Sequence, residues 1–368
     1  MTAAPRMLAL VGHAFGASGG IAQYNRDFLG GLVASGLVSD IEILPRHGPR
    51  TVETPPKIVQ HGPRFAPALY AAGAIAKALT ASFDLVFCGH LYMAPLAAIV
   101  ARLGRAKLVI QTHGIEAWPQ PTRLQRAAVE RADLVLSVSR YTRAKVLSWA
   151  SMAPEKVAVL PDTVGEAFTP GDGSALRAKW GLTGKRVLLT VGRMDGRERY
   201  KGHDRTIRAL PALIQRWPGV TYVVLGEGDD LARLQALAKD EGVDDHVKFM
   251  GPVDEATLID AYRMADVFVM PSTGEGFGIA YLEAMACGTP AIGLDAAGAR
   301  DAFADGRLSL LATESGLLDR LRELLNEPKP DPEALASAVR QSFGKPVFVA
   351  EQKRLFDRLH GCASTGRR

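Results

Sequence analysis

Apolar runs of strand length alternate with segments of helical periodicity through almost the whole chain. In the first half these runs lie at 7–11, 85–87, 108–110, 134–136 and 157–160. In the second half they lie at 187–191, 222–225, 247–249, 267–270 and 291–292. A short run that is apolar throughout is typical of a strand buried on both faces. Because such runs alternate here with helical patterns, the sequence predicts an α/β fold with parallel sheets covered by helices.

The segment 161–174 interrupts the alternation with two prolines and three glycines, and it is interpreted as a linker between domains. We therefore predict two doubly wound, Rossmann-like domains, residues 1–165 and 166–345, which face one another across a deep cleft. The helical pattern in the tail, residues 346–368, is expected to cross back to the first domain. Ligands of such sheets bind at the carboxyl ends of the strands, which predicts a binding site in the cleft.

Charge is distributed unevenly over the chain, whose formal net charge is +5. Residues 1–165 hold 17 Lys and Arg against 10 Asp and Glu, whereas residues 166–368 hold 27 against 29. A basic first half suits an anionic membrane surface or a phosphorylated acceptor as partner. An ordinary solvated surface is the alternative interpretation. No nucleic-acid partner is expected.

The apolar runs also bear on location. None approaches the length of about 18 residues that a membrane-spanning helix needs, and the first residues lack a signal-peptide pattern. We therefore expect a cytoplasmic protein that is peripheral on the inner face of the plasma membrane. Cys88, Cys287 and Cys362 are widely spaced, which indicates reduced thiols rather than a disulfide framework or a zinc cluster.

The segment with the most chemical information is the glycine-rich turn 271–278, which follows a predicted strand and precedes a helical pattern. Free backbone N–H groups at a helix start attract an anion, and Gly276 and Gly278 let it approach closely. A carboxylate there would repel a phosphate, so Glu275 is expected to accept hydrogen bonds from uncharged hydroxyl groups. Glu283 lies roughly two helical turns further on and suits a second hydroxyl-bearing group. This arrangement fits a diphosphate with a sugar at each end; an ordinary pair of surface glutamates is the alternative.

The turn and several other segments resemble the retaining glycosyltransferases of family 4, which have the GT-B fold. The most specific motif is a Glu, seven residues and a second Glu, within GEGFGIAYLEAMACGTPAI. The resemblance covers nearly the whole chain. Its further markers are the segments 18–21, 112–116, 132–133, 138–142, 160–164, 191–193 and 201–204.

This resemblance implies roles for individual residues. Glu275 would bind hydroxyl groups of the donor sugar, and Glu283 would bind the nucleotide ribose. Arg193 and Lys201 would neutralise the diphosphate, on which charge develops as the glycosidic bond breaks. The implied catalytic residues are His113, Glu275, Arg193 and Lys201. Donor contacts through the backbone are implied for Gly19, Gly20, Met250, Gly276, Phe277 and Gly278.

His113 directly follows a predicted strand and is expected to face the cleft. The corresponding residue of the family lies near the reacting sugar; a loop histidine with satisfied hydrogen bonds is the alternative. Glu116 and Trp118 are expected to shape the acceptor pocket. His13 and His90 also follow predicted strands, and each by itself is interpreted as an ordinary loop histidine.

The segment between Arg193 and Lys201 departs from the family pattern because it is longer. It contains two further cations, Arg197 and Arg199, so the cation that contacts the diphosphate stays open. A surface salt bridge is the alternative role for Arg193.

Together these observations predict transfer of a hexose from GDP-mannose or a UDP-hexose to an acceptor hydroxyl, with retention of configuration (class EC 2.4). The acceptor is expected to be a glycan or a lipid-linked sugar in exopolysaccharide or lipid-linked glycan assembly. No metal or other cofactor is expected, since no cluster with ligand spacing is found. A nucleotide-sugar epimerase of the same fold and a non-catalytic nucleotide-binding protein are the alternatives. A dinucleotide oxidoreductase fits less well, because Gly12, Gly16 and Gly19 lack the required spacing.

Overall fold

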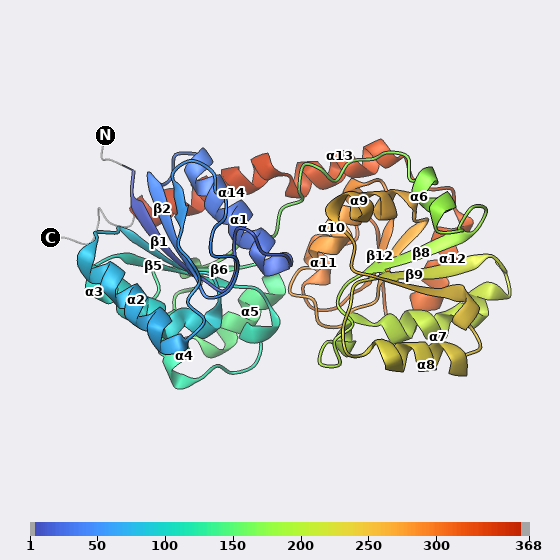
Figure 1. Cartoon of the computed structure of the whole chain (residues 1–368), viewed down its shortest axis with the longest axis horizontal. Coiled ribbons are helices and arrows are strands. Elements are labelled where there is room, and N and C mark those ends of the chain that lie inside the picture. Colours follow the sequence, from blue (N-terminus) through green and yellow to red (C-terminus); the bar gives the residue numbers. More distant parts are fainter. Residues whose placement is uncertain (1–3, 362–368) are drawn as a thin grey trace. The chain divides into compact units, whose positions relative to one another are not determined.

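The computed structural model describes residues 4–361, which form two compact units (Figure 1). Unit 1 comprises the chain up to Thr163 together with the segment from Lys345 onward, and unit 2 comprises Val164–Gly344. Cys88 and Cys287 are buried free thiols, whereas Cys362 lies outside the described residues. Within the described part of the chain, no helix has both the length and the apolarity that crossing a membrane requires.

Unit 1 is built on a seven-stranded parallel sheet in the order β3-β2-β1-β4-β5-β6-β7. Its strands are β1 (Arg6–Val11), β2 (Asp40–Pro45), β3 (Ile58–Gln60), β4 (Leu85–Cys88), β5 (Lys107–Thr112), β6 (Leu134–Ser137) and β7 (Val157–Val159). Its helices are α1 (Gly20–Ala34), α2 (Pro67–Thr80), α3 (Ala94–Gly104), α4 (Arg123–Glu130), α5 (Arg140–Trp149) and α14 (Lys345–Gly361). Single 3-10 turns lie at Leu91–Met93, Ile115–Ala117 and Pro154–Lys156.

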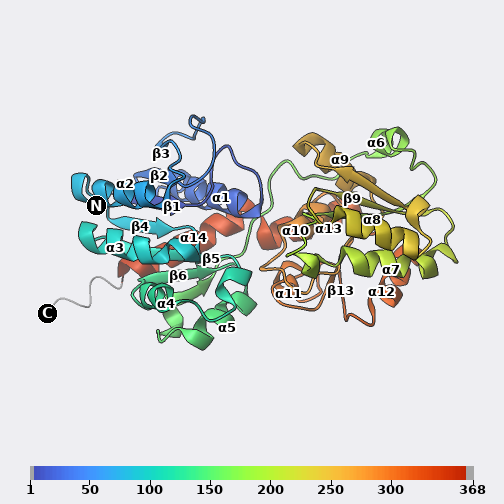
Figure 2. The same ribbon diagram turned by 60° about the horizontal axis from the view of Figure 1, so that its bottom comes forward.

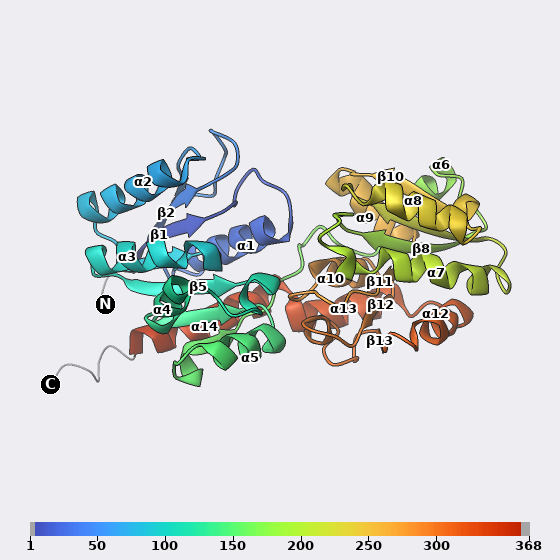
Figure 3. The ribbon, with the colours of Figure 1, turned by 90° about the horizontal axis from the view of Figure 1, so that it is seen from below.

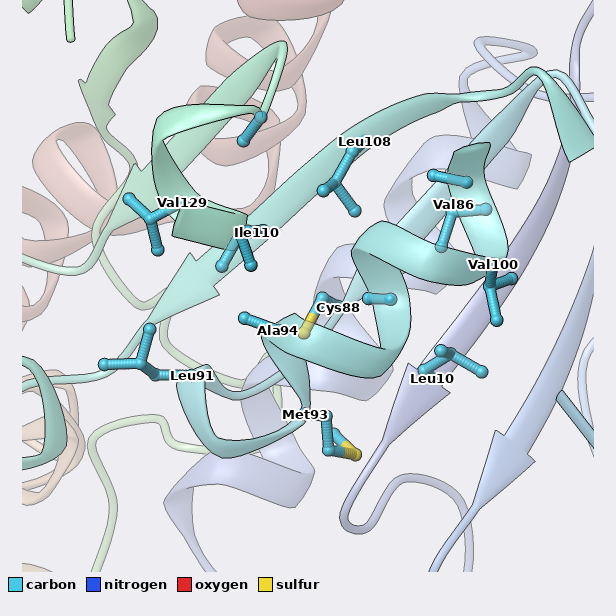
Figure 4. Close-up of a cluster of buried hydrophobic side chains, with 14 of the residues drawn as sticks. Leu10, Val86, Cys88, Leu91, Met93, Ala94, Val100, Leu108, Ile110 and Val129 are labelled. Carbon is cyan, nitrogen blue, oxygen red and sulfur yellow. The ribbon is translucent and has the colours of Figure 1, made fainter. Parts of the chain in front are cut away.

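Helices cover both faces of this sheet. One face packs against α2, α3, α4 and α5, of which α2 and α3 lie side by side in Figure 2. Figure 4 shows the centre of this core, where Ala94 and Val100 of α3 lie over Val86, Leu108 and Ile110 of the sheet. The strands are apolar on both sides because both sides are buried, which explains the continuous apolar runs of the sequence.

The last helix, α14, packs against α1 on the other face of the unit 1 sheet. A Cβ atom at Gly31 of α1 would lie 2.4 Å from Oε1 of Gln352, so a larger residue there would displace the Gln352 side chain. The Gln352 side chain donates a 2.8 Å hydrogen bond to the carbonyl oxygen of Phe28. Phe356 is completely buried beside Phe28. The final helix is therefore an integral part of the core of unit 1.

Unit 2 is built on a six-stranded parallel sheet in the order β10-β9-β8-β11-β12-β13. Its strands are β8 (Arg186–Val191), β9 (Val220–Leu225), β10 (Val247–Gly251), β11 (Val267–Met270), β12 (Ala291–Leu294) and β13 (Leu310–Ala312). Its helices are α6 (Ser174–Lys179), α7 (His203–Ile214), α8 (Leu231–Asp240), α9 (Glu255–Met264), α10 (Ile279–Ala286), α11 (Ala299–Ala302), α12 (Leu317–Asn326) and α13 (Pro332–Phe343). Single 3-10 turns lie at Arg199–Lys201 and Asp244–His246.

The unit 2 sheet is also covered on both faces. The helices α7, α8 and α12 pack on one face, and α7 and α8 lie side by side in Figure 3. The other face carries α9 and α10, and α13 packs on α10. Both units thus have doubly wound, parallel α/β sheets, which confirms the predicted fold class.

Each sheet has one point where the strand order reverses. In unit 2 the chain moves outward from β8 through β9 to β10, and then returns to place β11 on the other side of β8. In unit 1 the same reversal places β4 beside β1. Ligands of open α/β sheets bind beyond the carboxyl ends of the strands at such a point. A ligand-binding site is therefore expected at the loops after β8 and β11 in unit 2, and at those after β1 and β4 in unit 1.

Candidate functional site

The glycine-rich turn 271–278 connects β11 to α10 at the strand reversal of unit 2. Gly278 has a φ of 101°, and a Cβ atom there would lie 2.5 Å from the Tyr281 ring. Only glycine fits both the backbone conformation and the available space. No side chain caps the start of α10, and its first turn holds no acidic residue. The N–H groups of that turn are therefore not occupied by a side-chain cap and suit an anion.

An ion pair joins this turn to the loop after β8. Nζ of Lys201 lies 3.0 Å from Oε1 of Glu275, and the two side chains are only 14% and 13% exposed. Gly202 has a φ of 81°, and a Cβ atom there would lie 2.3 Å from the carbonyl oxygen of Pro271. The two loops are therefore packed backbone to backbone, which fixes the Lys201 side chain beside the turn.

The second predicted cation, Arg193, lies two residues beyond the end of β8, and its side chain is 70% exposed. It forms an ion pair with Glu198, whose side chain is only 16% exposed. Oε2 of Glu198 is buried and has no hydrogen-bond partner among the described residues. The other cations of the loop have partners of their own, since Arg197 pairs with Asp195 and Arg199 with Asp230.

Glu283 lies in the second turn of α10, the helix that follows the glycine-rich segment. The hydroxyl of Tyr262 donates a 2.8 Å hydrogen bond to its Oε2. Burial raises the pKa of Glu283 to about 7, although the hydrogen bond from Tyr262 acts in the opposite direction. At neutral pH this carboxyl is therefore poised between its protonated and ionised forms, and both forms can bind a hydroxyl group.

The neighbouring predicted donor contacts are available only through the backbone. The Phe277 side chain is 2% exposed and packs edge-on against Phe343, with ring centroids 5.4 Å apart. The carbonyl of Gly276 packs so closely on Gly298 that a Cβ atom on Gly298 would lie 1.8 Å from its oxygen. Met250 lies within β10 and is half-buried.

Unit 1 has its own glycine-rich helix start. Gly19 has a φ of 99°, and no atom lies within 4 Å of a Cβ built on it. Gly20 begins α1, which has no side-chain cap and no acidic residue in its first turn. The backbone at both glycines is thus exposed and unobstructed.

His113 follows β5 at the carboxyl edge of the unit 1 sheet. Its Nε2 lies 3.0 Å from the carbonyl oxygen of Gly89, so Nε2 carries the hydrogen and Nδ1 is left as an acceptor. Burial lowers the pKa of His113 to about 4, which keeps the imidazole neutral at pH 7. The ring of His90 lies 6.1 Å from that of His113, and Tyr24 packs edge-on at 5.2 Å.

The two residues expected to shape an acceptor pocket have structural partners within unit 1. Glu116 accepts a hydrogen bond from the backbone N–H of His113, so it holds that loop in place. The indole N–H of Trp118 donates to Oγ1 of Thr142 at 3.1 Å. The Trp118 ring packs edge-on against Tyr141.

The structure joins Lys201 to Glu275 of the turn, whereas Met250 lies on β10, which β9 and β8 separate from β11, and Arg193 contacts Glu198. It also adds partners that the sequence did not indicate. These are Glu198, Tyr262 and Gly298. Gly298 has an ordinary backbone conformation, so only its close approach to Gly276 explains it. Among residues 4–361, no group of three or more His, Cys, Asp or Glu side chains is arranged to hold a metal ion.

Two protein families match the chain. Residues 18–165 match glycosyltransferase family 4, and residues 173–342 match glycosyl transferases group 1. A GDP-mannose-dependent alpha-(1-6)-phosphatidylinositol monomannoside mannosyltransferase of Mycolicibacterium smegmatis is 33% identical over 316 residues. The matched region covers 78% of this chain and 80% of that protein.

Solved structures share the architecture over almost the full length. Anabaena HepE in complex with UDP and glucose has a TM-score of 0.78 at 19% identity, and the match covers 96% of this chain and 100% of that chain. Sucrose-phosphate synthase from Thermosynechococcus elongatus has a TM-score of 0.76 at 21% identity, covering 97% and 100%. At these identities the likeness shows the fold, which is GT-B. Sequence and fold together show that the chain belongs to glycosyltransferase family 4 and is a glycosyltransferase that uses a nucleotide sugar.

Proposed function

We propose that the protein transfers a hexose, with retention of configuration, from a nucleotide sugar bound at the turn 271–278 to the hydroxyl group of a lipid-linked or other glycan acceptor. The observation that carries this proposal is the nearly enclosed Lys201–Glu275 ion pair beside the uncapped start of α10. It sets a cation, a carboxylate and free N–H groups around one point at the carboxyl edge of the sheet.

The charges of this site suit a diphosphate and a sugar at the same time. A lysine has three N–H donors, so Lys201 can keep its contact with Glu275 while it donates to a phosphate oxygen. Arg193, just beyond the end of β8, adds a second positive charge. One oxygen of Glu275 is left for hydroxyl groups of the transferred sugar, and Glu283 suits the ribose. Fixed donors of this kind typically contribute about 3–4 kcal/mol to stabilisation of a transition state.

In the proposed reaction the bond between C1 of the sugar and the diphosphate oxygen breaks. The acceptor oxygen bonds to C1 on the same face, and its proton passes to the departing diphosphate. Lys201, Arg193 and the N–H groups of α10 stabilise the charge that grows on the leaving group, so we propose no metal ion. His113 is proposed to accept a hydrogen bond from a substrate hydroxyl through Nδ1. The start of α1, at Gly19 and Gly20, is proposed to bind an anionic group of a substrate.

GDP-mannose is the first donor to test. A relative that is 33% identical is named as GDP-mannose-dependent, whereas HepE, seen with UDP, is only 19% identical. A UDP-hexose is the second candidate. The same relative acts on a phosphatidylinositol mannoside, which supports a lipid-linked acceptor and a location at the cytoplasmic face of the plasma membrane. Sedimentation with anionic liposomes at low salt tests that location, and a protein that stays in the supernatant would contradict it.

Thermal unfolding with GDP, UDP and ADP sugars tests the choice of donor. A ligand at a hundredfold excess over its Kd stabilises the folded protein by about 2.7 kcal/mol, which raises the midpoint measurably. Proton NMR of the reaction product then reports its anomeric configuration. Formation of a new nucleotide sugar without acceptor would instead favour an epimerase. Binding without any turnover would favour a non-catalytic role.

A further inference from the structure

A second cluster of basic side chains lies in unit 1, beyond the ends of β1 and β2. The backbone pairing of these strands continues past their ends, since Arg46 donates to the carbonyl of Val11 and His47 to that of Gly12, both at 3.0 Å. Residues 46 and 47 are thereby held beside His13, which follows Gly12. The cluster therefore sits at the carboxyl edge of the sheet, beside its strand reversal.

Arg46 is a cation without an anionic partner. Its guanidinium lies over the rings of Tyr70 and Tyr92, at 6.0 and 5.8 Å from their centroids. Its Nη2 donates to the carbonyl oxygen of Phe65, but its buried Nε has no hydrogen-bond partner, and no carboxylate of residues 4–361 forms an ion pair with it. Stacking on aromatic rings holds a guanidinium in place but does not neutralise it. A partly desolvated cation of this kind favours an incoming anion.

Two histidines complete the cluster. The rings of His13 and His47 are stacked, with centroids 5.2 Å apart and planes inclined by 25°. No hydrogen bond or ion pair to either imidazole is found within residues 4–361. Phe65 joins the histidines to Arg46, because its carbonyl binds Arg46 and its ring lies 5.8 Å from that of His47. The cluster thus offers one permanent positive charge and two imidazole rings whose N–H groups can donate hydrogen bonds.

The cluster is connected to the proposed hydroxyl-binding histidine by aromatic contacts. Tyr92, which lies under Arg46, packs on His90 with ring centroids 4.6 Å apart. His90 in turn lies 6.1 Å from His113. Gly12 leaves room for this arrangement, since a Cβ atom there would lie 3.2 Å from the Tyr92 hydroxyl. A single ligand with a phosphate at one end and a hydroxyl at the other can therefore contact both ends of this row.

We propose that Arg46, His13 and His47 bind a phosphate group of the glycosyl acceptor. One permanent charge and two imidazole hydrogen-bond donors match a phosphate ester better than a neutral sugar. That the bound phosphate belongs to the acceptor rests on the proposed function, whereas the phosphate site itself does not. The site is separate from the diphosphate site of unit 2 because it uses only residues of unit 1.

Histidine ring NMR tests the site directly. With the donor site saturated by GDP, glycerol 3-phosphate is titrated against glycerol as the neutral control. We expect the ring signals of His13 and His47, assigned with H13Q and H47Q, to shift with the phosphate ester alone. R46Q should abolish the shifts, R46K should keep most of them, and R50Q, which removes an exposed charge of the same loop, should leave them unchanged. Equal shifts with glycerol, or none with the ester, would overturn the proposal.

Kinetics separate an acceptor phosphate from a free phosphate ion. With a phosphorylated acceptor, R46Q is expected to raise the acceptor KM at least tenfold, while the donor KM and donor hydrolysis without acceptor stay as in wild type. If inorganic phosphate binds as tightly as the ester and R46Q leaves the acceptor KM unchanged, the acceptor assignment is wrong. A wild-type protein that binds no nucleotide sugar would instead refute the proposed function, and the NMR titration would still test the phosphate site.

Discussion

Single residues around the turn 271–278 carry the donor chemistry proposed for unit 2. Lys201 and Glu275 are both largely buried and form an ion pair beside the start of α10. In this setting the carboxylate binds hydroxyl groups, while the cation binds phosphate. The two functions can therefore be removed separately.

Glu275→Gln tests that separation. The amide keeps the shape of the side chain but loses the charge that strengthens hydrogen bonds to sugar hydroxyls. We expect transfer to fall by about a hundredfold or more, with the Kd for GDP changed only slightly. Transfer assays and calorimetric titration with GDP measure the two quantities. Glu314→Gln, at a 65% exposed position, serves as the control; wild-type turnover in Glu275→Gln would contradict the sugar-binding role.

Glu198 competes with the donor for Arg193. The ion pair with Glu198 neutralises part of the charge that Arg193 would offer to a diphosphate. Because Arg193 is largely exposed, the pair is worth at most about 1 kcal/mol. Glu198→Gln should therefore tighten GDP binding by up to about fivefold. Weaker binding in this variant would show that Glu198 positions Arg193 instead.

The raised pKa of Glu283 makes stability depend on pH. The folded protein holds this proton up to a pKa of about 7, against about 4.5 in an unfolded chain. The bound proton contributes fully to the stability of the folded protein below pH 4.5, and this contribution is lost as the pH rises through 7. Glu283→Gln should match wild type near pH 4.5 and exceed it by on the order of 3 kcal/mol at pH 8.5. Urea unfolding at the two pH values measures this, and equal stability at pH 8.5 would refute it.

The sequence predicted the residues of the turn better than their partners. Glycines and a carboxylate between a strand and a helix form a local pattern, so Glu275 and Gly278 could be identified from it. The hydrogen bond from Tyr262 to Glu283 joins two different helices, which no local pattern reveals. The Arg193–Glu198 pair lies in an irregular loop, which has no hydrophobic periodicity from which the pairing could be predicted.

At the scale of elements, two loops are fastened together by close backbone contact. Gly202 is the N-cap residue of α7, and its backbone packs against Pro271 of the turn. This contact sets the distance between Lys201 and the start of α10. The position of the cation therefore depends on a glycine that touches no substrate in the proposed site.

Gly202→Ala should disturb this contact. The substitution adds a Cβ atom 2.3 Å from a carbonyl oxygen and forces alanine to a φ of 81°. We expect a loss of stability of more than about 1–2 kcal/mol and weaker GDP binding. Gly242→Ala is the matched control, because its φ is 67° but no atom lies within 4 Å of its Cβ. Equal effects of the two substitutions would show that the contact with Pro271 is unimportant.

Strands with continuous apolar runs were predicted, but β2, β3 and β13 were not. In β2, Asp40 and Glu42 interrupt the apolar pattern, and their charges are accommodated because Arg6 of the neighbouring β1 pairs with both. Pairing across strands cannot be read from the pattern of one strand. Both β3 and β13 have only three residues and are not part of a longer apolar run, whereas the equally short β7 lies in the four-residue apolar run 157–160.

At the scale of the whole molecule, the chain leaves unit 1 after Thr163 and returns to it at Lys345. The returning helix α14 supplies Phe356 and Gln352 to the unit 1 core. Unit 1 thus depends on the last segment of the chain, whereas the donor-binding residues proposed here belong to unit 2.

Phe356→Ala should therefore affect the units unequally. Removing a completely buried phenylalanine costs about 3–5 kcal/mol, which would lower the unfolding temperature of unit 1. The transition that GDP stabilises should shift much less, since it reports on unit 2. Leu124→Ala, at a 72% exposed position of α4, is the control and should leave both transitions unchanged. Equal loss in both units would contradict this account.

The most direct test of the donor site is a crystal structure of the protein with bound GDP. We expect the diphosphate to lie beside the start of α10, within hydrogen-bond distance of Lys201 and Arg193, with a ribose hydroxyl on Glu283. A nucleotide bound elsewhere, with the turn 271–278 untouched, would contradict it.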